Sequence, residues 1–292
     1  MGLEESPMRV KFALITGGTR GLGECLVRRF WLEGYSLAVV GRRDAEIGNV
    51  LNALPKRDNQ EALALPCDLG SPAQVADLIE RVKAECPALN VLLNNAAVQE
   101  PIGPIWEIDI SCWQKTLQID LLAPVALCHG LIPLMRARED GGSIINLSGG
   151  GATGPRANLS AYATAKAGLV RFSETIAEEL RATGIRVNCI APGAMKTHLL
   201  VELLAEGNAA GEREHAAARK VFEEGGASMD RVADLALFLA SDASKGITGK
   251  LISAVWDDWE YWPEHLAELS SSDAYTLRRI AGRDRGFAWG DK

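Results

Sequence analysis

The chain has 292 residues, of which 47% are hydrophobic and 24% are charged, and its formal net charge is −7. This composition excludes wholesale disorder, and it is sufficient for the core of one large α/β domain or two small ones. The acidic balance and the lack of a basic stripe argue against nucleic acid as a partner.

The cysteines, histidines and apolar segments bear on the cellular compartment, on metal binding and on membrane association. Six scattered cysteines without a CxxC pair predict reduced thiols, most of them buried, in a cytoplasmic protein. The four histidines do not cluster with cysteines at ligand spacing, so we expect no bound metal. Neither a signal peptide nor an apolar stretch of membrane-spanning length is evident, so we expect no membrane association.

Apolar runs of strand length alternate with segments of helical periodicity along most of the chain. Strands are predicted at residues 11–18, 36–43, 61–69, 90–97, 142–148, 184–193 and 249–256. Helices are predicted over residues 21–34, from the N-cap and proline at Ser71–Pro72, from Ser111 to about Arg138 with a bend near Pro124, over 160–180, and over 230–242. This alternation predicts a parallel sheet of about seven strands with right-handed crossovers and helices on both faces.

Residues 8–255 show no linker or internal repeat, so we expect one domain there. Within it, residues 198–228 are helical in composition but interrupted by glycines, and we predict a helical lid. Residues 256–292 form an extension that carries four of the seven tryptophans: Trp256, Trp259, Trp262 and Trp289. Disordered tails are poor in aromatic residues, so this extension is expected to pack on the domain or on a neighbouring subunit. We favour a structural cap or subunit contact over direct substrate contact.

The first predicted strand leads into TGGTRGLG at residues 16–23, with glycines in the pattern G-x3-G-x-G. Glycines at a strand-to-helix turn let a pyrophosphate approach the backbone, and the helix N-terminus supplies N–H donors. An ordinary glycine-rich turn would look the same in isolation. Its place in the first β-α-β unit favours a dinucleotide site.

The second predicted strand ends in Arg42 and Arg43, where dinucleotide sites often place an acidic residue on the ribose hydroxyls. Arg20 in the glycine loop is a third cation. Guanidinium groups suit a 2′-phosphate, which a carboxylate would repel, so this corner indicates NADP rather than NAD. The alternative is a solvated helix start, which would explain one arginine more easily than three.

Tyr162 and Lys166 are spaced i, i+4 and therefore share one face of a predicted helix. A nearby ammonium favours the phenolate and is expected to lower the pKa of the tyrosine. Most pairs with this spacing are surface pairs. Here the pair follows a strand with a polar, glycine-rich end, where α/β sheets carry ligand sites.

Together with these motifs, NNAA at 94–97, YATAK at 162–166 and RVNCIAPGAMKT at 186–197 resemble the classical short-chain dehydrogenase/reductase (SDR) family over about residues 10–255. The resemblance implies a Rossmann-type, doubly wound α/β sheet that binds a nicotinamide cofactor. It also implies hydride transfer between an alcohol and a carbonyl, and a homodimer or homotetramer.

The resemblance also assigns roles to residues. Tyr162 would be the acid/base, and Lys166 would bind the nicotinamide ribose and tune the tyrosine. Asp68 would contact the adenine, and Asn94 would support the cofactor site. The predicted cofactor-binding residues are Gly17, Thr19, Arg20, Gly21, Leu22, Gly23, Arg42, Arg43, Asp68, Leu69, Asn94, Ala96, Tyr162, Lys166, Pro192, Gly193 and Thr197.

The chain departs from the family at two catalytic positions. The family's serine, thirteen residues before the tyrosine, falls on Gly149, with Ser148 one step early. Strand alternation would turn Ser148 away, but the glycines at 149–151 allow the backbone to kink, so we predict that Ser148 is recruited. The family's asparagine falls on Asp120, which accepts hydrogen bonds but donates none when ionised.

The sequence therefore predicts an NADP(H)-dependent oxidoreductase that interconverts a ketone and a secondary alcohol, with a polar, sugar-like substrate as one option. Its catalytic residues would be Tyr162, Lys166, Ser148 and Asp120. The alternative is an NADP-binding protein of the same fold with impaired or redirected chemistry, such as a sensor or structural subunit.

Overall fold

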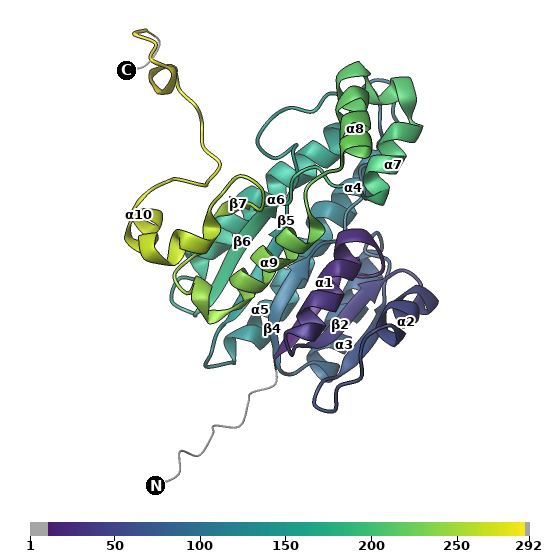
Figure 1. Cartoon of the computed structure of the whole chain (residues 1–292), viewed down its shortest axis with the longest axis vertical. Helices are drawn as coiled ribbons and strands as arrows, with labels where there is room; N and C mark the ends of the chain where they lie inside the picture. The colour runs from purple at the N-terminus through teal and green to yellow at the C-terminus, as the bar shows by residue number, and fades with distance from the viewer. Residues whose placement is uncertain (1–10, 290–292) are drawn as a thin grey trace.

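A seven-stranded sheet forms the centre of the computed structural model, which describes residues 11–289 (Figure 1). Residues 8–10 and 290–292 of the predicted domain and extension lie outside the described residues. The strand order is β3-β2-β1-β4-β5-β6-β7, and every adjacent pair is parallel. The strands are β1 Phe12–Thr16, β2 Ser36–Gly41, β3 Ala62–Pro66, β4 Leu89–Asn94, β5 Gly142–Leu147, β6 Ile185–Ala191 and β7 Leu251–Ser253.

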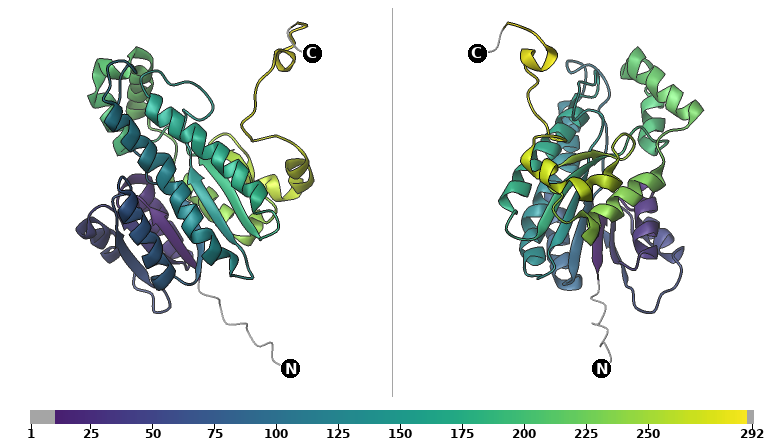
Figure 2. Two further views of the ribbon diagram at one scale, coloured as in Figure 1. Left: turned by 180° about the vertical axis from the view of Figure 1, so that it is seen from behind. Right: turned by 60° about the vertical axis from the view of Figure 1, so that its left-hand side comes forward.

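Helices cover both faces of the sheet, as Figures 1 and 2 show. On one face lie α1 (Gly21–Leu32), α2 (Asp44–Asn52) and α9 (Met229–Ala240). On the other lie α3 (Pro72–Glu85), α5 (Ala123–Arg136) and α6 (Ser160–Glu179). Alternate residues of β1 feed the two cores, Ala13 and Ile15 one and Phe12 and Leu14 the other, as a strand buried on both faces requires. The predicted doubly wound fold is confirmed.

The helix expected after Ser111 contains a π-helical turn rather than a simple bend. Helix α4 (Ile110–Leu117) runs into the π turn η1 (Gln118–Leu122), and α5 continues from it. Pro124 has no N–H to donate, so the preceding turn cannot keep a regular hydrogen-bond ladder. The wider turn carries Asp120, which is fully buried.

The combined helix Ile110–Arg136 is 27 residues long and contains a window of 18 residues with a mean hydropathy of 1.6, enough by length and composition to cross a membrane. The expectation that no apolar stretch reaches this length is therefore wrong. Leu127, Leu131 and Met135 of this helix are fully buried in the core that α5 shares with α3. These contacts are those of a core helix in a doubly wound fold.

The extension folds back onto the edge strand β7. Trp259 and Trp262, in the 3-10 segment η4 (Trp259–His265), are buried in the α9 core. After α10 (Leu266–Ser271), the chain runs beside β7, where Leu251 N donates to Tyr275 O at 2.8 Å. Beyond that point it leads away from the body (Figure 1). The extension thus covers a sheet edge that would otherwise expose unpaired backbone groups.

Candidate active site

The glycine loop is fastened to the neighbouring strand β4 by Asn95. Its side-chain amide donates to Thr16 O at 2.9 Å and to Gly17 O at 3.2 Å, and its own N–H donates to Thr16 Oγ1 at 3.0 Å. Gly17 has φ +65°, and a Cβ on Gly23 would overlap the Gly17 carbonyl oxygen. Two glycines are therefore required by the backbone itself.

The start of α1 fits a pyrophosphate. The side chain of its N-cap residue, Arg20, makes no capping hydrogen bond, so it leaves the N–H groups of the first turn open. Those donors and the positive end of the helix dipole meet the cavity where an anionic group would approach. The residues present fit a dinucleotide at this position.

A cavity of about 720 Å³ lies at the carboxyl ends of the strands and contains most of the predicted site. Of the predicted residues, it is lined by Gly17, Thr19, Arg20, Gly21, Leu22, Gly23, Arg42, Arg43, Asp68, Leu69, Ala96, Ser148, Tyr162, Lys166, Pro192, Gly193 and Thr197. Asn94 and Asp120 are not part of its wall. Asp68 uses one carboxylate oxygen to accept the N–H of Gly70 at 2.9 Å.

The three arginines of the predicted phosphate corner all line this cavity and are all exposed. Arg43 pairs with Glu46 one helical turn later. Among the described residues, Arg20 and Arg42 have no ion-pair partner. The corner therefore offers cations whose charge the rest of the fold does not neutralise.

Tyr162 and Lys166 lie on the buried face of α6, beside the end of β5. Lys166 Nζ donates to Leu147 O at 3.0 Å and lies 3.4 Å from Asp120 Oδ2 and 5.6 Å from the Tyr162 ring centroid. The second oxygen of Asp120, Oδ1, accepts the N–H of Val98 at 2.9 Å. Asp120 is thus an ion-pair partner of Lys166 and lies outside the cavity wall.

Burial dominates the electrostatics of this group. It raises the pKa of Tyr162, and Asp120 acts in the same direction, which together outweigh the lowering effect of Lys166 and Arg156. The expectation that Lys166 lowers this pKa overall is therefore wrong, because desolvation of the phenolate was left out. Burial also raises the pKa of Asp120 to about 6, against the opposing influence of Lys166 and the Val98 N–H.

Gly149 packs directly against Tyr162. A Cβ at this position would overlap the Tyr162 hydroxyl oxygen, so the tyrosine occupies the space that a side chain at 149 would take. Ser148 lines the same cavity and is only 3% exposed, and its hydroxyl has no hydrogen-bond partner among the described residues. An unpaired buried hydroxyl facing a cavity is a candidate ligand contact.

Asn94 lies beneath the cavity rather than in its wall. Its amide donates to Asn146 Oδ1 at 2.8 Å, and Asn146 donates in turn to Ser173 Oγ on α6 at 2.7 Å. This buried ladder joins β4, β5 and α6 under Tyr162 and Lys166. The adjacent Asn95 lines the cavity and holds the glycine loop, a role that the sequence pattern NNAA did not assign to either asparagine.

The sequence did not reveal several cavity residues, including a group near the lid helices α7 (His198–Ala205) and α8 (Glu212–Glu224). Arg156 lies between β5 and α6 and pairs with Glu214 of α8 at 2.6 Å. Gln99 donates to the Leu199 carbonyl at the start of α7. Of the four tryptophans in the extension, all of which the structure describes, Trp256 alone lines the cavity. Short sequence motifs could not predict these contacts, because the partners lie far apart in the sequence.

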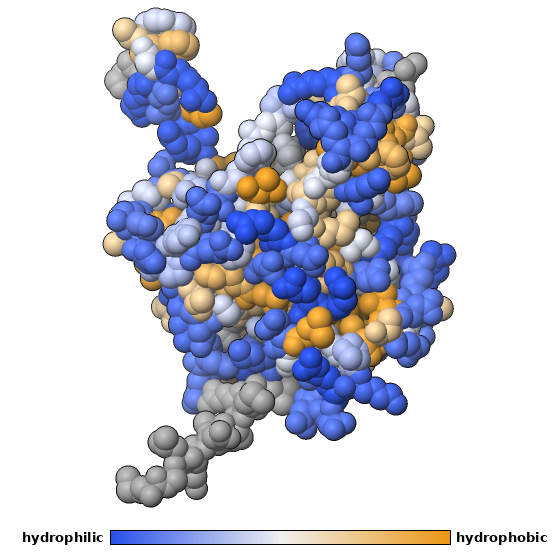
Figure 3. All heavy atoms as spheres, viewed as in Figure 1, coloured by the Kyte–Doolittle hydropathy of each residue, from blue (hydrophilic) through white to orange (hydrophobic). Residues whose placement is uncertain are grey.

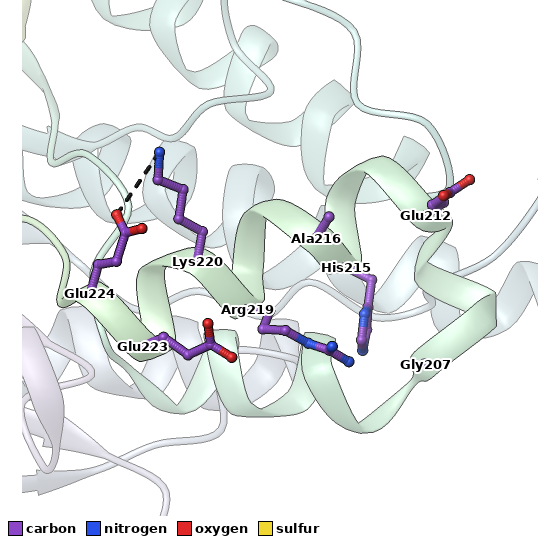
Figure 4. A pocket seen from close by; sticks show the side chains of 8 residues that line it. All are labelled: Gly207, Glu212, His215, Ala216, Arg219, Lys220, Glu223 and Glu224. Atoms are coloured by element: carbon purple, nitrogen blue, oxygen red, sulfur yellow. Dashed lines mark ion pairs between the residues drawn. The ribbon is translucent and has the colours of Figure 1, made fainter.

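A second hollow, of about 630 Å³, lies along the outer face of α8 (Figure 4). Its charged side chains are of both signs, and Lys220 pairs with Glu224 at 3.9 Å. Figure 3 shows that this part of the surface is mostly hydrophilic. None of the described residues that line the hollow is buried, so we assign the chemistry to the larger cavity.

Comparison with known proteins places the chain in a family. The family model described as short chain dehydrogenase matches residues 11–207. The chain is 34% identical to cis-4-hydroxycyclohexanecarboxylate dehydrogenase of Sinomonas cyclohexanicum over 83% of this chain and 94% of that protein. It is 29% identical to 2,3-dihydro-2,3-dihydroxybenzoate dehydrogenase of Bacillus subtilis, over 82% and 92% of the two chains.

Among solved structures, YwfH, an NADPH-dependent reductase involved in bacilysin biosynthesis, superposes with a TM-score of 0.74 at 24% identity, covering 84% of this chain and 96% of that one. This likeness bears on the fold. The family match and the sequence relatives show that the chain belongs to the short-chain dehydrogenase/reductase family. It is an NAD(P)-dependent oxidoreductase that acts on an alcohol or ketone, as its sequence predicts.

Proposed function

We propose that this protein is an NADP(H)-dependent reductase of a ketone, with Tyr162 as the proton donor. The observation that carries the proposal is the placement of Tyr162 and Lys166 in one cavity with the glycine loop and the arginine corner. A bound nicotinamide supplies a hydride to the carbonyl carbon. The Tyr162 hydroxyl gives its proton to the carbonyl oxygen, and the product is a secondary alcohol.

Burial raises the pKa of Tyr162, so the phenol carries the proton that the carbonyl oxygen receives in the reduction. Lys166 stays within 3.4 Å of Asp120 and holds a positive charge beside the ring. That charge stabilises the phenolate formed when the proton leaves.

Ser148 is proposed to donate a hydrogen bond to the developing oxyanion. Its hydroxyl is buried, unpaired among residues 11–289 and part of the cavity wall. Gly149 cannot take this role, because it has no side chain and its Cβ position is filled by the Tyr162 hydroxyl. The packing of Gly149 against Tyr162 and the unpaired hydroxyl of Ser148 both support a catalytic serine one residue before the family's position.

A preference for NADP over NAD is proposed from the arginine corner. Arg20 and Arg42 are exposed cations without an ion-pair partner among the described residues. At the end of β2, Arg42 stands where an acidic side chain would hold the ribose hydroxyls of NAD. A 2′-phosphate would supply the missing negative charge. YwfH, which has a similar fold, is an NADPH-dependent reductase, in line with this assignment.

The substrate is proposed to be a polar carbonyl compound, with sugar-like molecules as one class. Trp256 offers an exposed ring at the cavity mouth, which suits stacking on a sugar or a cyclic substrate. The two sequence relatives are named for ring compounds that carry both a hydroxyl and a carboxylate. A cytoplasmic homodimer or homotetramer is proposed on the six free thiols and the family alone.

The test is NADPH binding by cofactor fluorescence, followed by turnover on a panel of ketones. We expect saturable binding and oxidation of NADPH with at least one ketone. Binding without turnover on the panel, with oxidation of the matching alcohols also absent, would instead support the alternative of a cofactor-binding protein with redirected chemistry.

A further inference from the structure

The loop before α6 and the lid helix α8 are joined by one ion pair inside the cavity. Arg156 Nη2 lies 2.6 Å and Arg156 Nε 3.0 Å from the same oxygen of Glu214, Oε2. The two side chains are 23% and 14% exposed. Both residues line the cavity that contains Tyr162.

This pairing leaves one edge of the guanidinium unused. Arginine has five N–H donors in a planar fork, and Glu214 engages the edge formed by Nε and Nη2. No described residue accepts a hydrogen bond from Nη1. The Arg156 guanidinium carbon lies 5.9 Å from the Tyr162 ring centroid, so the free edge is close to the reacting centre.

The other cations in the cavity wall are not available to a substrate at this end. Lys166 is engaged by Leu147 O and Asp120. The other basic side chains lie elsewhere in the cavity. The three arginines form the corner described above, and Lys115 lies beside Asp68. His198, at the start of α7, lies 3.1 Å from Glu202. Among the described residues, Arg156 is the arginine beside Tyr162 with unused donors, and Lys166 is already assigned to the proposed cofactor.

We propose that the free edge of Arg156 binds a carboxylate of the substrate, so that the substrate is a ketone or secondary alcohol that also carries a carboxylate. This inference rests on the proposed reductase function and names its substrate class. A planar carboxylate matches the fork with two parallel hydrogen bonds, which a single hydroxyl cannot do. Glu214 is a positioning residue, because it fixes the guanidinium from the opposite edge.

The first experiment compares 4-oxocyclohexanecarboxylate with its neutral carboxamide as substrates for NADPH oxidation. Wild-type protein is expected to prefer the carboxylate by about tenfold to a hundredfold in kcat/KM, the range of a charge-assisted pair. Arg156→Leu should remove this preference, so that the carboxylate and the carboxamide are reduced with equal kcat/KM. Arg213→Leu, the same change on the exposed face of α8, should keep it.

Glu214 is tested by the same selectivity ratio. Glu214→Leu is expected to raise KM for the carboxylate with little change in kcat, because the guanidinium loses its orientation. Glu214→Gln keeps an oxygen acceptor and should restore most of the lost affinity. A change in protein stability alone would not alter the carboxylate-to-carboxamide ratio.

The two failures are distinguishable. Turnover of the carboxamide at the rate of the carboxylate, or an unchanged preference in Arg156→Leu, would overturn the carboxylate site and leave the reductase intact. If neither compound is reduced, titration of 4-oxocyclohexanecarboxylate into the NADPH complex gives a readout independent of turnover. Saturable binding that Arg156→Leu abolishes would support the site, and absence of binding would overturn it.

Discussion

The two halves of the cavity are built in different ways. In the cofactor half, each functional residue follows a strand of the sheet, and the strand order brings Gly17, Arg42 and Asp68 to one edge. In the substrate half, side chains from loops and lid helices meet across long stretches of sequence, as Arg156 and Glu214 do. The first half is therefore a property of the topology and the second a property of particular side chains. Variants in the cofactor half should therefore change the affinity for NADPH, and variants in the substrate half should change the rate and the substrate selectivity.

The largest expected effect is at the point where the halves meet. Tyr162→Phe removes the proton donor but little cofactor contact, so kcat should fall by about 10²–10⁴ with NADPH affinity unchanged. Lys166→Ala should reduce both, because Lys166 is proposed to serve the ribose and the tyrosine. Steady-state rates and NADPH fluorescence titrations of the two variants check this. Full activity in Tyr162→Phe would contradict the mechanism.

Ser148→Ala should come next, with a loss of about 10²–10³ in kcat if its hydroxyl stabilises the oxyanion. Gly149→Ser is the matched variant, since it returns a serine to the family's position. It should also lower the rate, because its Cβ would displace the Tyr162 hydroxyl. A wild-type rate in Ser148→Ala would show that Ser148 takes no part.

The cofactor half is tested by Arg42→Asp combined with Arg43→Ala. Two charge-assisted contacts of roughly 1.5–3 kcal/mol each correspond to a preference for NADPH on the order of a hundredfold or more, which this double variant should lose. NADH affinity should be spared. Arg57→Ala, an exposed arginine outside the cavity, is the control. Equal binding of NADH and NADPH by wild-type protein would overturn the assignment of this corner.

The smallest expected effect is the pH dependence of stability at Asp120. Burial raises the pKa of this carboxyl from 3.8 to about 6 in the folded protein. The folded state therefore holds the proton more tightly, so this contribution to stability is greatest below the unfolded pKa and is lost as pH rises through about 6.

Asp120→Asn should lack this loss. As the pH rises from 3.8 to about 6, the unfolding free energy of the wild type should fall relative to that of the variant. Urea titrations at several pH values measure this difference. A constant difference would mean that Asp120 is ionised throughout, in an intact pair with Lys166.

The fold and the cofactor half could be predicted from sequence because they depend on local patterns. Alternating apolar runs define the strands, and the positions that follow them fall at the sheet edge by topology. The direction of the Tyr162 pKa was mispredicted because burial by residues outside the motif decides it. No motif around Arg156 predicts its role, because its ion-pair partner Glu214 lies 58 residues away in the sequence. The π turn at Asp120 likewise needs the packed helix to be seen.

The most direct test of the central claim follows one hydrogen atom. Wild-type protein would be incubated with a ketone and NADPH that carries deuterium at both C4 hydrogen positions of the nicotinamide, and the product alcohol analysed by mass spectrometry. The account predicts one deuterium on the carbinol carbon with wild-type protein, and almost none with Tyr162→Phe, which still binds NADPH. Binding of NADPH by the wild type without deuterium in any product would contradict the claim that this cavity reduces ketones.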